Sequence, residues 1–328
     1  MLDDRDITII IPTRNFDQLT KKCVHRINAL HPETPIIVLT DSLSDDNFDI
    51  KNLVIVPILT AASIAKKRNV GVGLANTKLI GFIDSDAYPD TYWLSTALKI
   101  LNSNNKVNII SGPNLCPLES PFGERLIGLC EKSFCITLNA KYVKQKGSEQ
   151  FVTTMPSCNL IIKKNLYERS GGMSEHLTGG EDFDFCIKLQ CLGQDIFYHP
   201  EVAVYHKSRN VMGFFLKRFS YGGFIADNIL KLLISGSYKT ILPACFLVLA
   251  LFFFLFSTPP FVYGLWALCC LCFLAVMTYE VWRISENILD VLLLFPLLFL
   301  GILLPGIGTL LKLIRIFPKY EKIYKNFD

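Results

Sequence analysis

Apolar positions in the first part of the chain fall into two alternating patterns. Short, continuous apolar runs, typical of buried strands, occur at 7–11, 35–39, 53–58, 79–83, 107–110 and 158–163. Segments with helical spacing lie between them, at 15–30, 63–75, 91–101 and 181–191. The interval 118–150 has weak periodicity, and 196–206 predicts a last strand or hairpin. Repeated strand–helix units predict an α/β, Rossmann-like domain whose mainly parallel sheet carries helices on both faces.

The pattern changes after residue 208. Aromatic residues are mixed with basic ones at 209–240, which predicts either an amphipathic helix at a membrane surface or a helix packed on the sheet. No Asp, Glu, Lys or Arg occurs at 241–279 or 291–311, so we expect a membrane region over 241–317 with spans near 241–258, 261–279 and 288–311. Pro296 and Pro305 interrupt the last span, and the basic tail 318–328 favours the cytoplasmic side. The last segment therefore either crosses the membrane or is re-entrant or interfacial, and the sequence leaves this open.

The net charge and the cysteine spacing exclude further classes of protein. The chain has 33 Lys and Arg against 29 Asp and Glu, and this net charge of +4 excludes a nucleic-acid binder by bulk charge. The cysteines before residue 241 lack C-x-x-C spacing, so neither a zinc site nor a disulfide framework is indicated. The first residues are acidic and lead directly into a strand, without the pattern of a signal peptide. We therefore expect a multi-pass protein of the cytoplasmic membrane, with the domain 1–208 facing the cytoplasm.

Acidic residues follow two of the predicted strands. Asp84-Ser85-Asp86 comes directly after 79–83, and Asp41 follows 35–39. Ligands of open α/β sheets bind beyond the carboxyl ends of the strands, so these residues point to one crevice. Asp84 and Asp86 could hold a hard divalent cation, which would neutralise charge on a departing nucleoside diphosphate. A solvated acidic turn is the alternative.

A second cluster, Gly179-Gly180-Glu181-Asp182, precedes the helix at 181–191. Paired glycines let the backbone approach a ligand closely. Carboxylates in the first helical turn are favoured in their ionised form, which a general base requires. Helix capping by Asp182 or Glu181 explains the same residues equally well.

The two clusters belong to a longer series of short motifs. In order these are Pro12-Thr13-Arg14-Asn15, Asp41-Ser42, Lys67-Arg68-Asn69-Val70-Gly71, Asp84-Ser85-Asp86, Cys158-Asn159-Leu160, Gly171-Gly172-Met173, Gly180-Glu181-Asp182 and Val204-Tyr205-His206. This order closely resembles family 2 glycosyltransferases of the GT-A fold, over residues 6 to about 207. The apolar C-terminal region is similar to that of members that act on lipid-linked acceptors.

The resemblance implies a role for each matching residue on the donor side. Pro12, Thr13 and Arg14 would lie beside the nucleotide base, Asp41 would contact the base or ribose, and Arg68 would lie near the diphosphate. For Arg68 the alternative is a solvated helix face formed with Lys66 and Lys67. Asp84 and Ser85 would contact the nucleotide-sugar. Asp86 would be the main metal ligand, and Asp84 and His206 would also belong to the metal site. The alternative for His206 is a structural histidine at the end of a strand, with its ring nitrogens hydrogen-bonded and no role at a metal.

On the acceptor side, Asp182 would be the catalytic base and Glu181 would bind the acceptor, with Gly179 and Gly180 beside them. The Q-x-x-R-W motif of processive synthases is absent. Arg218-x-x-Tyr221-Gly222 stands in its place and is similar to an element of non-processive, membrane-associated members, so Arg218 and Tyr221 are expected on the acceptor side. The loop after Asp41 lacks the usual glycine, which leaves the nucleotide preference open.

Together these features predict an inverting glycosyltransferase that depends on Mn²⁺ or Mg²⁺. It would move one sugar from a nucleotide-sugar, with a UDP-sugar as the expected donor, to a lipid-linked or cell-surface glycan acceptor at the membrane. Two alternatives remain: a membrane-anchored scaffold that binds nucleotide-sugars without turnover, and a nucleotidyltransferase, which would not need Asp182. The oligomeric state, including a homo-oligomer, is left open.

Overall fold

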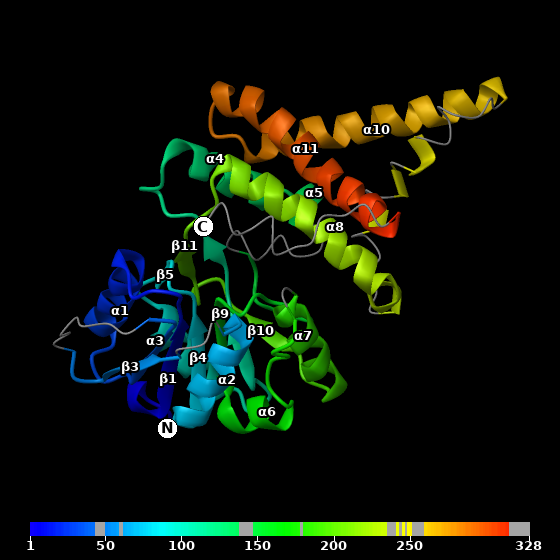
Figure 1. Cartoon of the computed structure of the whole chain (residues 1–328). Helices are drawn as coiled ribbons and strands as arrows, with labels where there is room; N and C mark the ends of the chain where they lie inside the picture. Colours follow the sequence, from blue (N-terminus) through cyan, green and yellow to red (C-terminus); the bar gives the residue numbers. More distant parts are fainter. Residues whose placement is uncertain are drawn as a thin grey trace. The chain divides into compact units, whose positions relative to one another are not determined.

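The computed structural model describes residues 1–42, 50–58, 62–137, 147–177, 180–234, 241–242, 245–246, 248–250 and 259–314. The chain divides into two compact units. The first comprises Met1–Pro117 and Tyr142–Lys207, and the second comprises Leu118–Lys141 and Ser208–Asp328. The elements of both are labelled in Figure 1.

An eight-stranded sheet forms the first unit, in the order β3-β2-β1-β4-β9-β6-β10-β8. Its strands are β1 (Ile7–Pro12), β2 (Ile36–Thr40), β3 (Leu53–Pro57), β4 (Leu79–Ile83), β6 (Ile109–Ser111), β8 (Gln150–Val152), β9 (Asn159–Lys163) and β10 (Ile196–Tyr198). The strands β3, β2, β1 and β4 run parallel, as expected from their continuous apolar runs. The sheet as a whole is mixed, because β9 runs antiparallel to both β4 and β6, and β8 runs antiparallel to β10.

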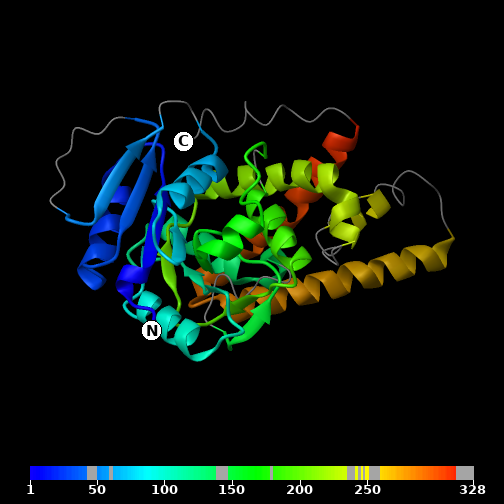
Figure 2. The ribbon, with the colours of Figure 1, turned by 90° about the horizontal axis from the view of Figure 1, so that it is seen from below.

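Helices cover both faces of this sheet (Figures 1 and 2). Residues of α1 (Gln18–Leu30) and α3 (Trp93–Ser103) share one buried apolar cluster with Ile7, Ile9 and Ile11 of β1. The opposite face carries α2 (Ile64–Leu74), α6 (Lys164–Arg169) and α7 (Glu181–Cys191). There the ring of Tyr167 packs at a tilt against those of Phe82 and Phe185, with centroids 5.4 and 5.1 Å apart. The expected α/β class is confirmed.

Two stretches of the first domain differ from the sequence expectation. The segment 196–206 is not a hairpin, because β11 (Val204–His206) leaves the main sheet and joins β5 (Ala87–Pro89) and β7 (Asn114–Leu115). The weakly periodic interval 118–150 contains the helices α4 (Phe122–Lys132) and α5 (Phe134–Thr137), which belong to the second unit. Within α4, Leu126, Leu129 and Cys130 are buried at helical spacing, but this signal covers only a short part of the interval.

Long apolar helices dominate the second unit: α8 (Val211–Ile234), α10 (Pro260–Ile284) and α11 (Ile288–Leu313). Among the described residues, two helices are long and apolar enough to cross a membrane, Phe261–Ile284 and Ile288–Leu313. They coincide with the predicted spans 261–279 and 288–311, and α11 continues through Pro296 and Pro305. Most of the predicted span 241–258 and all of the tail 318–328 lie outside the described residues. The domain limits 1–208, 209–240 and 241–317 stay predictions.

Candidate active site

The strand ends at one edge of the main sheet carry the polar residues of the candidate site. Pro12 pairs with Leu39, so Thr13 and Asp41 leave neighbouring strands together. Ile83 pairs with Asn159 across β4 and β9. Because β9 is antiparallel, the residues before it, Ser157 and Cys158, lie at the edge where β4 ends in Asp84. The residues at the expected crevice therefore come from the ends of β1, β2 and β4 and from the segment that leads into β9.

A buried lysine organises the cluster that was expected near the nucleotide base. The Asp41 amide donates to the Arg14 carbonyl at 2.9 Å. Lys67 Nζ donates to the Thr13 carbonyl at 2.6 Å and lies 2.8 Å from Asp41 Oδ1. The Lys67 side chain is 2% exposed, whereas that of Asp41 is 26% exposed. Lys67 thus joins the ends of β1 and β2, a role that the sequence analysis missed.

Arg68, next on α2, lies between two carboxylates of the site. Its Nη2 is 2.7 Å from Asp84 Oδ1, and its Nη1 is 3.6 Å from Asp182 Oδ1. Burial opposes the charge on Arg68, yet Asp84 and Asp182 together raise the pKa of its guanidinium. Burial alone would raise the pKa of Asp84, but Arg68 and His206 outweigh it and hold that pKa below its usual value. The alternative of a solvated helix face is wrong for Lys67 and Arg68 and holds for Lys66, which is exposed.

The rest of the Arg68-Asn69-Val70-Gly71 motif has a structural explanation. Asn69 donates to the Met173 carbonyl at 2.9 Å and accepts from the Met173 amide at 3.0 Å, which holds the turn at Gly172. A Cβ on Gly71 would lie 2.7 Å from Ile10 Cγ2, so only glycine lets α2 come this close to β1. This close approach brings Lys67 and Arg68 to the sheet edge.

Three of the predicted metal ligands lie together. His206 Nε2 is 3.3 Å from Asp86 Oδ1 and 3.7 Å from Asp84 Oδ2. Pairing of His206 with Ala87 across β11 and β5 brings this imidazole to the acidic turn. Two carboxylates and an imidazole are donors that suit Mn²⁺, and the carboxylates also suit Mg²⁺. The residues present therefore fit a divalent cation.

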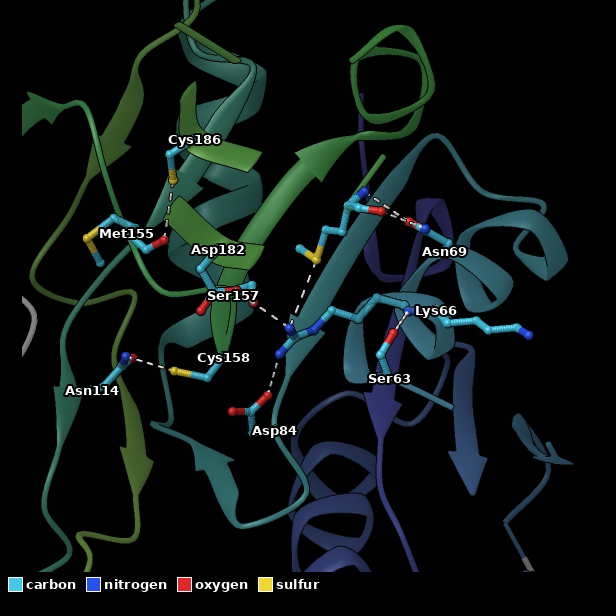
Figure 3. A network of polar contacts seen from close by, with 12 residues as sticks. Ser63, Lys66, Asn69, Asp84, Asn114, Met155, Ser157, Cys158, Asp182 and Cys186 are labelled. Atoms are coloured by element: carbon cyan, nitrogen blue, oxygen red, sulfur yellow. Dashed lines mark hydrogen bonds and ion pairs between the residues drawn. The ribbon is translucent and has the colours of Figure 1, made fainter. Parts of the chain in front are cut away.

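Asp182 enters the site from the first turn of α7. The N-cap of this helix is Gly180, which has a left-handed φ of 79° and makes no side-chain cap bond. Asp182 Oδ1 instead accepts a hydrogen bond from the Ser157 hydroxyl, and its side chain is 35% exposed (Figure 3). Helix capping by Asp182, the alternative interpretation, is therefore wrong. Ser157 was missed because an isolated serine before a strand carries no sequence signal.

The other predicted residues fall into three groups. Ser85 lies in the turn between Asp84 and Asp86, and Glu181 is half-buried at the start of α7. Gly179 lies outside the described residues. Arg218 and Tyr221 belong to the second unit, where Arg218 donates to the carbonyls of Gly301 and Ile136 at 2.7 and 3.2 Å. The acceptor-side role of these residues stays a prediction.

The fold and this acidic, metal-compatible edge define an α/β protein of the nucleotide-binding kind. The sequence profile of "Glycosyl transferase family group 2" matches residues 79–300, more than half of the chain, and the chain belongs to this glycosyltransferase family. The resemblance seen in the sequence is confirmed.

Curated relatives and a solved structure give two further comparisons. The pre-mycofactocin glycosyltransferases of two Mycobacterium tuberculosis strains, CDC 1551 / Oshkosh and ATCC 25618 / H37Rv, are each 25% identical over 257 residues, covering 71% of this chain and 51% of theirs. The chain thus spans about half the length of these curated relatives. The solved mannosyltransferase PcManGT from Pyrobaculum calidifontis, in complex with GDP-Man and Mn²⁺, superposes with a TM-score of 0.58 at 16% identity, over 94% of this chain and 87% of that one. This likeness shows that the fold is GT-A-like.

Proposed function

We propose that the first unit transfers one sugar from a nucleotide-sugar to an acceptor hydroxyl, with inversion at the anomeric carbon. The single observation that carries the proposal is the position of Arg68 between Asp84 and Asp182, with Asp86 and His206 beside Asp84. One cluster thereby contains the groups needed to bind a diphosphate and to remove a proton.

On the donor side, the chain offers a base cluster and a metal cluster. Thr13, Arg14 and Asp41, tied together by Lys67, would contact the base and ribose. A divalent cation held by Asp84, Asp86 and His206 would neutralise charge on the leaving nucleoside diphosphate. The solved GT-A relative in complex with GDP-Man and Mn²⁺ supports a nucleotide-sugar with a divalent cation. A UDP-sugar remains the proposed donor.

On the acceptor side, Asp182 would take the proton of the attacking hydroxyl. Ser157 and Arg68 both approach Oδ1 of Asp182, so we assign the acceptor proton to Oδ2. Holding one oxygen fixes the orientation of the carboxylate and aims the other at the acceptor. A single base and one in-line displacement give inversion, and Glu181 in the same turn would bind the acceptor.

The acceptor is proposed to be lipid-linked or a cell-surface glycan reached from the cytoplasmic face of the membrane. Large apolar side chains cover α10, and those of Phe261, Leu268 and Trp282 are 75%, 56% and 72% exposed. Exposed apolar surface of this extent on one long helix fits insertion into lipid. Attachment through this helix would keep the first unit near a membrane-bound acceptor.

Release of nucleoside diphosphate from a panel of nucleotide-sugars tests the proposal. The full chain in detergent would be assayed with a membrane lipid extract and Mn²⁺, Mg²⁺ or EDTA, beside Asp86→Ala and the surface control Glu168→Gln. We expect one donor to turn over with metal, with loss in EDTA and in Asp86→Ala but not in Glu168→Gln. Donor binding without release under every condition would instead support the scaffold alternative.

A further inference from the structure

A sulfur atom to which the proposed function gives no role lies beside two members of the metal cluster, Asp84 and His206. Asp84, Cys158 and His206 each offer one ligand atom, and these atoms all lie within 4.8 Å of one another. Two ligands on opposite sides of one cation are separated by the sum of their bond lengths, about 4.4 Å for sulfur facing nitrogen or oxygen. One ion can therefore reach all three residues after small side-chain movements.

The surroundings of Cys158 suit a metal-bound sulfur. Cys158 is buried, and its Sγ accepts a hydrogen bond from Asn114 Nδ2 at 2.9 Å (Figure 3). Hydrogen-bond donors around a ligand atom orient it and tune the metal site. Cys186 of the same unit behaves differently, because its thiol donates to the Met155 carbonyl at 3.5 Å. The sulfur of Cys158 thus accepts a hydrogen bond, whereas the thiol of Cys186 donates one.

We propose that Cys158 is a ligand of the metal site and shifts its selectivity from Mg²⁺ towards softer divalent cations such as Mn²⁺, Co²⁺, Zn²⁺ and Cd²⁺. The inference rests on the proposed function only in placing a cation at Asp84, Asp86 and His206. Mg²⁺ prefers an all-oxygen, octahedral set, whereas a sulfur donor favours softer cations. On coordination the thiol releases its proton to solvent, and the sulfur forms one bond to the cation.

Optical spectra of the Co²⁺-loaded full chain test the proposal without an activity assay. We expect a near-ultraviolet sulfur-to-cobalt band in the wild type, together with visible cobalt bands. Cys158→Ser should lose the near-ultraviolet band and keep the visible ones. We expect its affinity for Cd²⁺ to fall about tenfold or more, and its affinity for Mn²⁺ by less than about threefold. Cys186→Ser, the matched buried control, should keep both bands.

The contrary outcomes separate this inference from the proposed function. Visible bands without the sulfur band in the wild type, or a sulfur band that survives in Cys158→Ser, would overturn the Cys158 assignment and leave the metal site standing. Absence of any cobalt binding would overturn both the assignment and the metal part of the proposed function. X-ray absorption at the cadmium edge uses only the Cd²⁺-loaded wild type, so this test does not depend on whether a variant folds. One sulfur neighbour supports the proposal, and only oxygen and nitrogen neighbours overturn it.

Discussion

Arg68 shows how single residues hold this site together. Its guanidinium is 3% exposed and lies between Asp84 and Asp182, whose side chains are 29% and 35% exposed. Removing one partner of a buried ion pair leaves an uncompensated charge, which destabilises a protein strongly. Here partial exposure of the carboxylates reduces the effect through solvent screening.

We therefore expect Arg68→Met to lower the free energy of unfolding by about 2 kcal/mol or more. Lys66→Met is the matched control, because Lys66 has the same charge two positions earlier on α2 and is exposed. It should change stability by less than about 0.5 kcal/mol. Denaturant titrations of both variants measure the difference, and equal effects would contradict the bridging role of Arg68.

At this scale the sequence predicted the carboxylates of the site better than their partners. Asp84, Asp86 and His206 are brought together as the family resemblance implied. Lys67 was missed because three consecutive basic residues are typical of a solvated helix face. Its burial depends on the close packing of α2 against β1 at Gly71 and on the ion pair with Asp41. Both β1 and Asp41 are distant from Lys67 in sequence. A single sequence does not show such long-range contacts.

At the scale of elements, α8 and α11 share the most extensive helix–helix contact within the described part of the second unit. A Cβ on Gly222 would overlap the Pro305 carbonyl and the Thr309 amide, and a Cβ on Gly308 would overlap the Phe219 carbonyl. Thr309 Oγ1 also donates to the Gly222 carbonyl at 3.1 Å. Small residues of this kind let two helix backbones approach each other.

Gly222→Ala should destabilise the second unit by about 1–3 kcal/mol, since it overpacks this crossing. Gly264→Ala on α10 is the control, because a Cβ there meets no atom within 4 Å. Alanine is the better helix former, so the control should be neutral or slightly stabilising. Thermal unfolding in detergent compares the two, and a neutral Gly222→Ala would contradict the observed crossing.

Arg218 compensates for a proline inside α11. Residue 305 would normally donate its amide to the carbonyl four residues earlier, at Gly301, but Pro305 has no N–H. Arg218 Nε donates to that carbonyl instead, at 2.7 Å. The side chain thus supplies the hydrogen bond that the helix itself lacks.

A double-mutant cycle tests this compensation. Arg218→Met alone should cost about 1–3 kcal/mol, because it leaves the Gly301 carbonyl without its donor. Pro305→Ala restores a backbone N–H that can bond to the Gly301 carbonyl. The double variant should therefore lose about 0.5–2 kcal/mol less unfolding free energy than the two single losses added together. Strict additivity would show that the two residues are not coupled.

The elements themselves were largely predictable. The strands at the parallel end of the sheet match their predicted ranges within about a residue or two, since each is a continuous buried run. The direction of β9 and the split of 196–206 between two sheets were not, because local periodicity says nothing of which strands pair. The helix α4 was not predicted, because its buried residues at helical spacing cover only a short part of the interval 118–150.

At the scale of the whole molecule, the second unit bears on how the chain meets the membrane. Two polar contacts join α8 to α11: the hydrogen bond from Arg218 to the Gly301 carbonyl, and the ion pair of Asp227 with Lys312 at 3.4 Å. The helix α8 also carries Lys217. If α11 crossed the bilayer, α8 would enter with it, at a cost of about 2.5–3.5 kcal/mol for each charge near the centre.

We therefore expect α11 to lie in the membrane interface with α8, so that the chain end stays on the cytoplasmic side. A protease-sensitive tag after Asp328 should be cleaved in inside-out membrane vesicles and protected in intact cells. The opposite pattern would indicate that α11 crosses, and would contradict the interfacial arrangement.

The most direct test of the central claim separates donor binding from turnover in Asp182→Asn. This change removes the proposed base and leaves Asp84, Asp86 and His206 in place, so the donor Kd should stay within about threefold while kcat falls about a hundredfold to ten-thousandfold. Asp184→Asn is the control, because Asp184 lies in the same helical turn as Asp182. Its side chain accepts from Ser174 at 2.6 Å and pairs with Lys188 at 3.5 Å, and among the contacts described it touches no proposed site residue. Wild-type turnover by Asp182→Asn with the same donor would contradict the assignment of Asp182 as the base.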